Sequence, residues 1–146
     1  KKIGYARSVW AMISLNTRKP ADLLALHGGS IVDYVCDEPC PIEKPSRIKV
    51  TSTEPASSLN AKYSDIDING HVNSIRYIEH ILDLFPIELY KESRIRRFEM
   101  AYVAESYYGD ELTFYKDYVG NGTYDIEVRK NGGEAVCRSK VIFVEK

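Results

Sequence analysis

Three polar side chains that could perform chemistry stand two residues apart near the middle of the sequence: Asp67, Asn69 and His71. If this segment is extended, all three side chains point to the same side of the backbone. A carboxylate, an amide and an imidazole at one place can activate a water molecule and stabilise a developing oxyanion. This run is therefore the first candidate for a reactive site.

The residues that follow this run are typical of the start of a helix. Gly70 allows a tight bend and leaves room for a ligand carbonyl, and a helix start supplies N–H groups and a positive dipole end. Asp, Asn and Gly are also common capping and turn residues, so a purely structural role stays open. A single cap needs only one polar group, however, and the number gathered here favours a functional site. We assign Gly70, Val72 and Asn73 to substrate binding.

Apolar residues recur at three- and four-residue spacing after this run and predict one long helix, which Pro86 ends. They are Val72, Ile75, Ile78, Ile81, Leu82 and Phe85. Beyond the helix the period changes to two, which predicts strands near residues 97–102, 112–115, 124–128 and 135–144. Residues 120–122 and 131–133 supply the positive φ of tight hairpin turns, so successive strands are expected to be antiparallel. An antiparallel sheet that curls around one long helix is an α+β hot-dog fold.

The first part of the sequence differs in composition from the rest. Residues 6–13 are typical of a strand, with Trp10 expected in a core. Residues 20–45 contain a Gly pair and several Pro residues, which is typical of a linker with about one helical turn. Short strands are expected at residues 48–51 and 59–63. We place a boundary near Pro45, which separates residues 1–45 from a domain, residues 46–146, that carries the candidate site.

The bulk composition excludes several classes of function. A net charge of -1 over 146 residues, with the charges well mixed, gives no polyelectrolyte signal for nucleic acid or an anionic membrane. No apolar run approaches the roughly 18 residues of a membrane helix. Three cysteines do not suggest a disulfide framework, and Cys36 and Cys40 lack the further ligands that a zinc site requires. We expect no metal, no cofactor, no nucleic-acid partner and no membrane association.

Three segments resemble a known family in the order in which they occur there. The segment around Asp67 resembles the signature of hot-dog thioesterases, and it is most similar to that of the acyl-acyl carrier protein thioesterases of plants and bacteria. The other two resemble the strand after the helix and the end of the first hot-dog unit in that family. The three segments are residues 65–73 with 77–78, residues 98–106 with 109–110, and residues 6–12 with 17–19.

By this resemblance, whole members of the family contain two hot-dog units in tandem. Residues 46–146 would then be the second unit, and residues 1–45 would be the trailing strand of the first unit plus a linker. The family's catalytic residues fall on the acid Asp67, the amide Asn69, the imidazole His71 and a second acid, Glu105, in the next strand. Plant members have a Cys directly after that Glu, and this sequence has Ser106 there. Because a Ser needs a stronger general base than a thiol does, we expect a mechanism without an enzyme thiol.

The resemblance implies an enzyme that hydrolyses fatty acyl-acyl carrier protein thioesters to free fatty acid and carrier protein. One of the two acids would act as general base on a water molecule or attack the thioester carbonyl directly, while helix-start N–H groups hold the oxyanion. The residues do not choose between these two routes. Two other functions also stay open: an acyl-CoA thioesterase of the broader hot-dog class, and a non-catalytic hot-dog unit for binding or dimerisation.

The expected partner is an acyl carrier protein that bears a fatty acyl chain. Carrier proteins are acidic, so a basic cluster just after the helix is a candidate docking site, although basic residues on the outer face of a strand also serve simply to solvate it. The cluster consists of Lys91, Arg94, Arg96 and Arg97. A homodimer is compatible with the sequence. The expected location is the cytoplasm of a bacterium, or the plastid of a plant.

Overall fold

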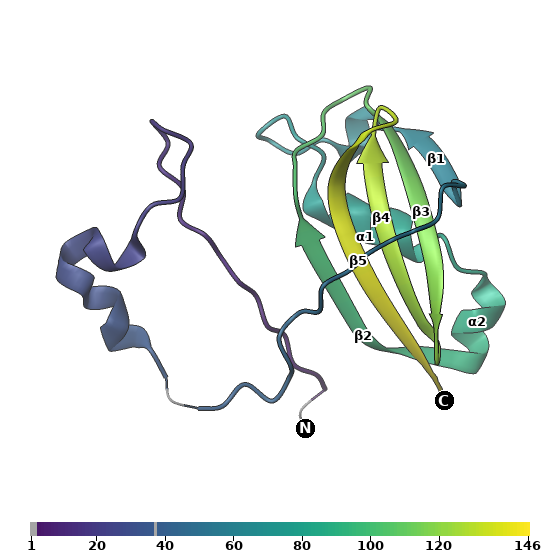
Figure 1. Cartoon of the computed structure of the whole chain (residues 1–146), viewed down its shortest axis with the longest axis horizontal. Coiled ribbons are helices and arrows are strands. Elements are labelled where there is room, and N and C mark those ends of the chain that lie inside the picture. The colour runs from purple at the N-terminus through teal and green to yellow at the C-terminus, as the bar shows by residue number, and fades with distance from the viewer. Residues whose placement is uncertain (1–2, 37) are drawn as a thin grey trace. The chain divides into compact units, whose positions relative to one another are not determined.

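The computed structural model describes residues 3–36 and 38–146. The chain divides into two compact units, Lys1–Pro45 and Ser46–Lys146. The elements, in chain order, are η1 (Leu23–Tyr34), β1 (Ser57–Asn60), η2 (Tyr63–Asp65), α1 (Ser74–Leu82), α2 (Ile87–Glu92), β2 (Ser93–Tyr102), β3 (Glu111–Gly120), β4 (Thr123–Lys130) and β5 (Glu134–Glu145) (Figure 1). All the strands and α-helices of the described residues therefore lie in the second unit.

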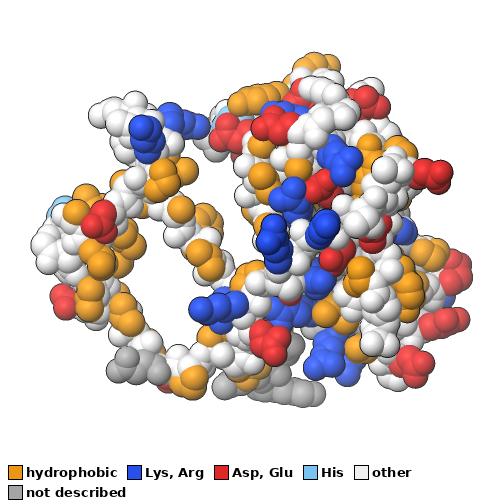
Figure 2. Space-filling model, in the orientation of Figure 1, with side chains coloured by type: hydrophobic (Ala, Val, Ile, Leu, Met, Phe, Trp, Pro, Cys, Tyr) orange, Lys and Arg blue, Asp and Glu red, His pale blue; other side chains and the backbone are white. Residues whose placement is uncertain are grey.

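The first unit has no hydrophobic core of its own. None of its described residues is buried, and Figure 2 shows hydrophobic side chains along its surface. Trp10, expected in a core, is 89% exposed in this structure. Residues 6–13, expected to be a strand, form none in this structure, where no neighbouring strand takes their N–H and C=O groups. Of these residues, only Ile13 forms a β-bridge, with Pro20, in the described part of the chain.

The second unit is built on one antiparallel sheet with the strand order β1-β3-β4-β5-β2. β3, β4 and β5 form a meander, and the tight turns between them contain Asn121 and Asn131 with positive φ, as the sequence predicts. β2 lies outside this meander. It crosses to the far edge and pairs with β5, from Ser93 opposite Glu145 to Tyr102 opposite Cys137. The register of β2 therefore depends on a strand that is distant in sequence.

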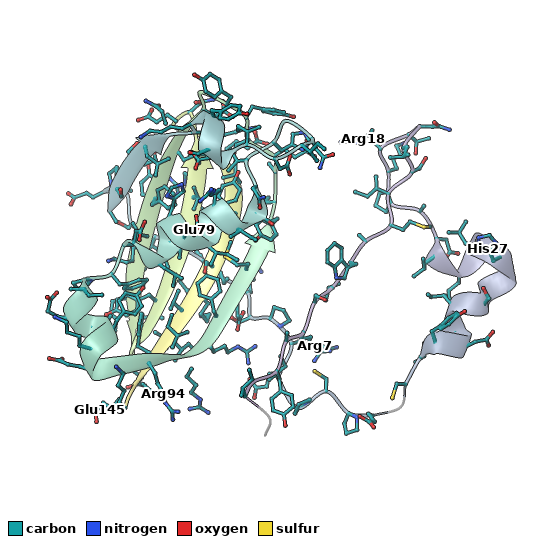
Figure 3. The ribbon with its side chains drawn as sticks, turned by 180° about the vertical axis from the view of Figure 1, so that it is seen from behind. Arg7, Arg18, His27, Glu79, Arg94 and Glu145 are labelled. Carbon is teal, nitrogen blue, oxygen red and sulfur yellow. The ribbon has the colours of Figure 1, made fainter. Side chains whose placement is uncertain are left out.

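α1 packs across the inner face of this sheet (Figures 1 and 3). It has nine residues and is shorter than predicted; it begins after Asn73, which caps it by accepting a 3.0 Å hydrogen bond from Ile75 N, and it ends at Leu82. Tyr77 and Ile81 are buried, whereas Ile75 is 58% exposed. The apolar stripe is thus turned relative to the predicted one, with Tyr77 facing the sheet in place of Ile75. Pro86 follows this helix as predicted, but it also caps a second short helix, α2, that the periodicity did not indicate.

The core lies between α1 and the inner face of the sheet. It is formed by buried side chains from the helix region and from β3, β4 and β5, which alternate with outward-facing residues along each strand. The largest of them are Tyr77, Ile81, Phe85, Leu112, Phe114, Ile126, Val128, Val141 and Phe143. This is the curled antiparallel sheet with one helix against it that the sequence predicts.

A segment without regular structure, residues 46–52, crosses the outer face of the sheet, and we call it the strap (Figure 1). At one end, Ser46 donates from N and Oγ to Glu99 on β2, at 2.8 and 3.0 Å. At the other end, Thr51 donates from N and Oγ1 to Asp117 on β3, at 2.6 and 2.8 Å. The strand predicted within this segment is wrong, since side-chain carboxylates take its N–H groups where a strand would pair with another strand.

Candidate active site

The run from Asp67 to His71 forms a tight turn, and it is not the extended segment that its alternation suggests. Asp67 N donates to His71 O at 2.8 Å, and Gly70 N donates to Asp67 O at 3.0 Å. Gly70 has a φ of 81°, a conformation that glycine adopts without strain. Ile68, at the tip of the turn, is fully exposed, so it forms no apolar wall. Alternate residues of this run therefore do not line up on one side.

The carboxylate of Asp67 holds this turn together. Its Oδ1 accepts hydrogen bonds from Asn69 N at 2.8 Å and from His71 N at 3.3 Å. Its Oδ2 has no hydrogen-bond partner among the residues that the structure describes. Two backbone donors on one oxygen fix the carboxylate and leave the second oxygen available for a substrate or a water molecule. The side chain of Asn69 is exposed beside it.

The side chains of His71 and Glu105 meet across two loops. His71 Nε2 lies 3.5 Å from Glu105 Oε2, and both side chains are partly exposed. Backbone and side-chain bonds hold the two loops in this arrangement: Val72 N donates to Ser106 O at 2.8 Å, and Lys130 Nζ donates to Glu105 O at 2.7 Å. Glu105 was expected within a strand, but it lies in the loop after β2. A loop position leaves this carboxylate open to solvent.

Ser106 faces the opposite way from Glu105. It is 1% exposed, and its hydroxyl shares a hydrogen bond with the hydroxyl of Tyr77. Burial raises the pKa of Tyr77 to about 12, although the hydrogen bond with Ser106 opposes this shift. Both groups are therefore neutral partners inside the core. The Ser106 hydroxyl is thus enclosed in the core, whereas the Glu105 carboxylate is partly exposed.

Tyr107 belongs to the same cluster, and the sequence interpretation missed it. Its hydroxyl donates to Glu105 Oε2 at 3.2 Å, and its ring packs edge-on against His71 with the ring centroids 5.2 Å apart. Ser106 is buried, whereas the residues on either side of it, Glu105 and Tyr107, are both exposed. In the sequence, Tyr107 stands two residues after Glu105. Such a spacing indicates a shared face in a strand, but in a loop it does not by itself identify a neighbour in the site.

The residues predicted to bind substrate are placed differently from one another. Gly70 is exposed in the turn, Val72 is buried in the core, and Asn73 caps α1.

The N–H groups at the helix start were expected to hold an oxyanion, but several already have acceptors. Asn73 N donates to Asp65 O at 2.7 Å, and Ile75 N donates to the Asn73 side chain. The N–H groups of Asn73 and Ile75 are therefore already engaged within the protein.

The basic cluster lies apart from His71 and Glu105. It comprises Lys91 in α2 and Arg94, Arg96 and Arg97 in β2. Arg97 is paired with Glu99, Nε to Oε1, at 2.5 Å. Figure 3 shows Arg94 at the end of the sheet where Glu145 also lies. Since a strand rises roughly 3.3 Å per residue, Arg94 is roughly 30 Å along the chain direction from the loop that carries Glu105.

In residues 3–36 and 38–146, no three His, Cys, Asp or Glu side chains are grouped as the ligands of a metal ion would be. No helix in the same residues is both long enough and apolar enough to cross a bilayer.

Comparison with known proteins decides the family. Residues 48–145 match the acyl-ACP thioesterase C-terminal domain. The chain belongs to the acyl-ACP thioesterase family. The match contains the turn at Asp67 and the loop at Glu105, and it confirms the family resemblance drawn from the sequence.

Solved structures agree with this assignment and confirm the hot-dog fold. An acyl-ACP thioesterase from Bacteroides thetaiotaomicron superposes with a TM-score of 0.92 at 78% identity, over 99% of this chain and 58% of that chain. The 12:0-ACP thioesterase from Umbellularia californica superposes with a TM-score of 0.72 over 92% of this chain and 53% of that chain. Its identity is 18%, so it supports the fold alone.

A curated plant relative extends the comparison. The dodecanoyl-[acyl-carrier-protein] hydrolase of Cinnamomum camphora, described as chloroplastic, is 27% identical over 103 residues. The alignment covers 67% of this chain and 27% of the plant protein. The chain thus spans about a quarter of that relative, and 58% of the Bacteroides protein.

Proposed function

We propose that this protein hydrolyses fatty acyl thioesters of acyl carrier protein and releases free fatty acid and the carrier thiol. The observation that carries the proposal is the meeting of His71 and Glu105 at 3.5 Å, beside the turn that Asp67 holds. Family membership supports the substrate class, because the Bacteroides relative is described as an acyl-ACP thioesterase and the Cinnamomum relative as a dodecanoyl-[acyl-carrier-protein] hydrolase.

Asp67 is the general base in this proposal. Its Oδ2 takes a proton from a water molecule while the water oxygen attacks the carbonyl carbon of the thioester. The exposed amide of Asn69 donates an N–H to the oxygen of the tetrahedral intermediate, where negative charge develops. The anchoring of Asp67 Oδ1 by two backbone N–H groups supports this role, since it fixes the direction of Oδ2 before substrate arrives.

His71 and Glu105 serve the leaving group. When the intermediate collapses, the C–S bond breaks and the sulfur takes a proton from Nδ1 of the protonated His71 ring, while the Nε2–H stays directed at Glu105. Glu105 orients this imidazole and stabilises its protonated form, as a carboxylate does in other acid-imidazole pairs. Asp67 then returns its proton to His71 through water, which restores both groups. The products are the fatty acid and the free thiol of the carrier.

The experiment that tests the proposal compares one fatty acyl chain presented on acyl carrier protein and on coenzyme A, with the whole protein as enzyme. We expect a higher kcat/KM for the carrier-bound substrate and a loss of at least about 100-fold in kcat in Glu105→Gln. Equal or better turnover of acyl-CoA would assign the protein to the broader acyl-CoA class. A folded protein that hydrolyses neither substrate would instead be a non-catalytic hot-dog unit.

Other assignments stay predictions. The exposed hydrophobic surface of residues 3–36 supports their assignment to a first hot-dog unit, whose remaining strands would cover it. Docking of the carrier at the basic cluster requires a partner large enough to reach from Arg94 to the loop of Glu105. The 78% identity with a bacterial protein favours the bacterial cytoplasm over a plastid. A homodimer likewise stays a prediction.

A further inference from the structure

We infer that Tyr107 is a positioning residue that holds the His71–Glu105 pair in its reactive geometry. This inference rests on the proposed function, because it assigns a role within the same site. It concerns a residue that neither family membership nor the sequence motif marks.

Tyr107 contacts both members of the pair with different parts of one side chain. Its hydroxyl donates to Glu105 Oε2 at 3.2 Å, and this is the same oxygen that lies 3.5 Å from His71 Nε2. Its ring meets the imidazole of His71 edge-on, with an interplanar angle of 76°. The hydroxyl therefore limits the rotation of the carboxylate, while the ring limits the rotation of the imidazole. A pair of partly exposed side chains would otherwise sample several rotamers.

The backbone of Tyr107 is fixed independently of its side chain. Tyr107 N donates to Asp110 Oδ2 at 2.9 Å, and Asp110 N donates back to Tyr107 O at 3.1 Å. The hydrogen bond from Asn131 holds the pKa of Asp110 below its usual value, and the Tyr107 N–H adds to this effect while burial opposes it. Tyr107 also forms a β-bridge with His71. The ring thus projects from a rigid loop, as a positioning group must.

Packing in the core does not explain this residue. Tyr107 is 46% exposed and lies outside the core cluster, so its side chain contributes little to burial. The neighbouring Tyr108 is 70% exposed and makes no side-chain hydrogen bond among the described residues. Two adjacent exposed tyrosines, only one of which contacts His71 and Glu105, provide a control within the chain.

The kinetic test uses Tyr107→Phe, Tyr107→Ala and the control Tyr108→Phe in the whole protein, assayed with acyl carrier protein substrate. Tyr107→Phe keeps the ring against His71 and removes the bond to Glu105, so kcat should fall about fivefold with KM unchanged, as expected for one half-exposed hydrogen bond to a charged group. Tyr107→Ala should fall further because the ring contact is also lost. Tyr108→Phe should match the wild type. In a Glu105→Ala background, Tyr107→Phe should cause no additional loss, because the acceptor of the hydroxyl is already absent.

A second readout does not depend on turnover. The ring signals of His71 in an NMR spectrum of the folded protein should move in Tyr107→Phe and stay in place in Tyr108→Phe. The inference is overturned if these signals do not move, or if kcat of Tyr107→Phe stays within about twofold of the wild type. If the wild type lacks thioesterase activity while the His71 signals still respond to Tyr107→Phe, the proposed function fails and the positioning contact stands.

Discussion

Replacing Ser106 by alanine separates a structural serine from a nucleophilic one. The hydroxyl of Ser106 is bonded to the hydroxyl of Tyr77 inside the core, where the two residues are 1% and 3% exposed. Ser106→Ala removes this partner and leaves a buried phenol hydroxyl unsatisfied. The variant should therefore lose stability and keep its turnover, which is the reverse of what loss of a nucleophile would produce.

The size of the effect follows from the burial of the pair. A lost intramolecular hydrogen bond costs about 1 kcal/mol, and an unsatisfied buried donor adds a similar penalty, so we expect a loss of about 2 kcal/mol in the free energy of unfolding. For a domain of about 100 residues, this corresponds to a Tm lower by about 10 °C. Tyr77→Phe removes the other partner and should cost about as much. The double variant should cost less than the sum of the two, because neither polar group is then left unpaired.

The assay combines urea unfolding of the four proteins in this cycle with kcat measured below the lowest Tm. Ser106→Ala should keep kcat within about twofold of the wild type. A fall of 100-fold or more in a variant that is still folded would refute the assignment and return Ser106 to the chemistry. Additive stability losses in the double variant would show that the two hydroxyls do not interact.

Three further predictions address the turn, the strap and the basic cluster. Asp67→Asn keeps an oxygen that can accept the two backbone hydrogen bonds of the turn, so the Tm of this variant should match that of the wild type. Its kcat should fall at least about 100-fold. Turnover at the wild-type rate would show that Asp67 only holds the turn. The backbone N–H of Thr51 holds the pKa of Asp117 below its ordinary value of 3.8. This carboxylate therefore stabilises the fold fully above about pH 4, and its contribution to the free energy of unfolding is lost as the pH falls through the lower pKa of the folded state. Urea unfolding of Asp117→Ala should show a loss of about 1 to 2 kcal/mol at pH 7 and a weaker acid dependence than the wild type. Arg94→Glu combined with Arg96→Glu should raise KM severalfold for acyl carrier protein and leave KM for acyl-CoA unchanged, and an unchanged KM for both would remove the docking role.

Local patterns in the sequence predicted much of the second unit. The period of two after residue 97 located the strands because it reports a half-buried face, and the Asn-Gly runs located the hairpins because Asn and Gly tolerate positive φ. The same pattern cannot report which strand is the neighbour. The strand near residues 97–102 was predicted, but its crossing to the far edge to pair with β5 was not. The strap was mistaken for a strand for a related reason, since its partners, Glu99 and Asp117, are carboxylates on distant strands.

The same distinction between local pattern and tertiary arrangement applies to the candidate site. The sequence by itself indicated Asp67, Asn69 and His71 as candidate groups, because residue type and local spacing can be read from the chain, and the family resemblance added Glu105 as a further candidate. Only the tertiary structure decided how they are arranged. It closed the first three into a turn, brought Glu105 to His71, and added Tyr107 to the pair. The physical reason is that these side chains meet across two loops whose positions depend on long-range backbone pairing, such as Val72 N with Ser106 O, and local periodicity carries no information about such pairing.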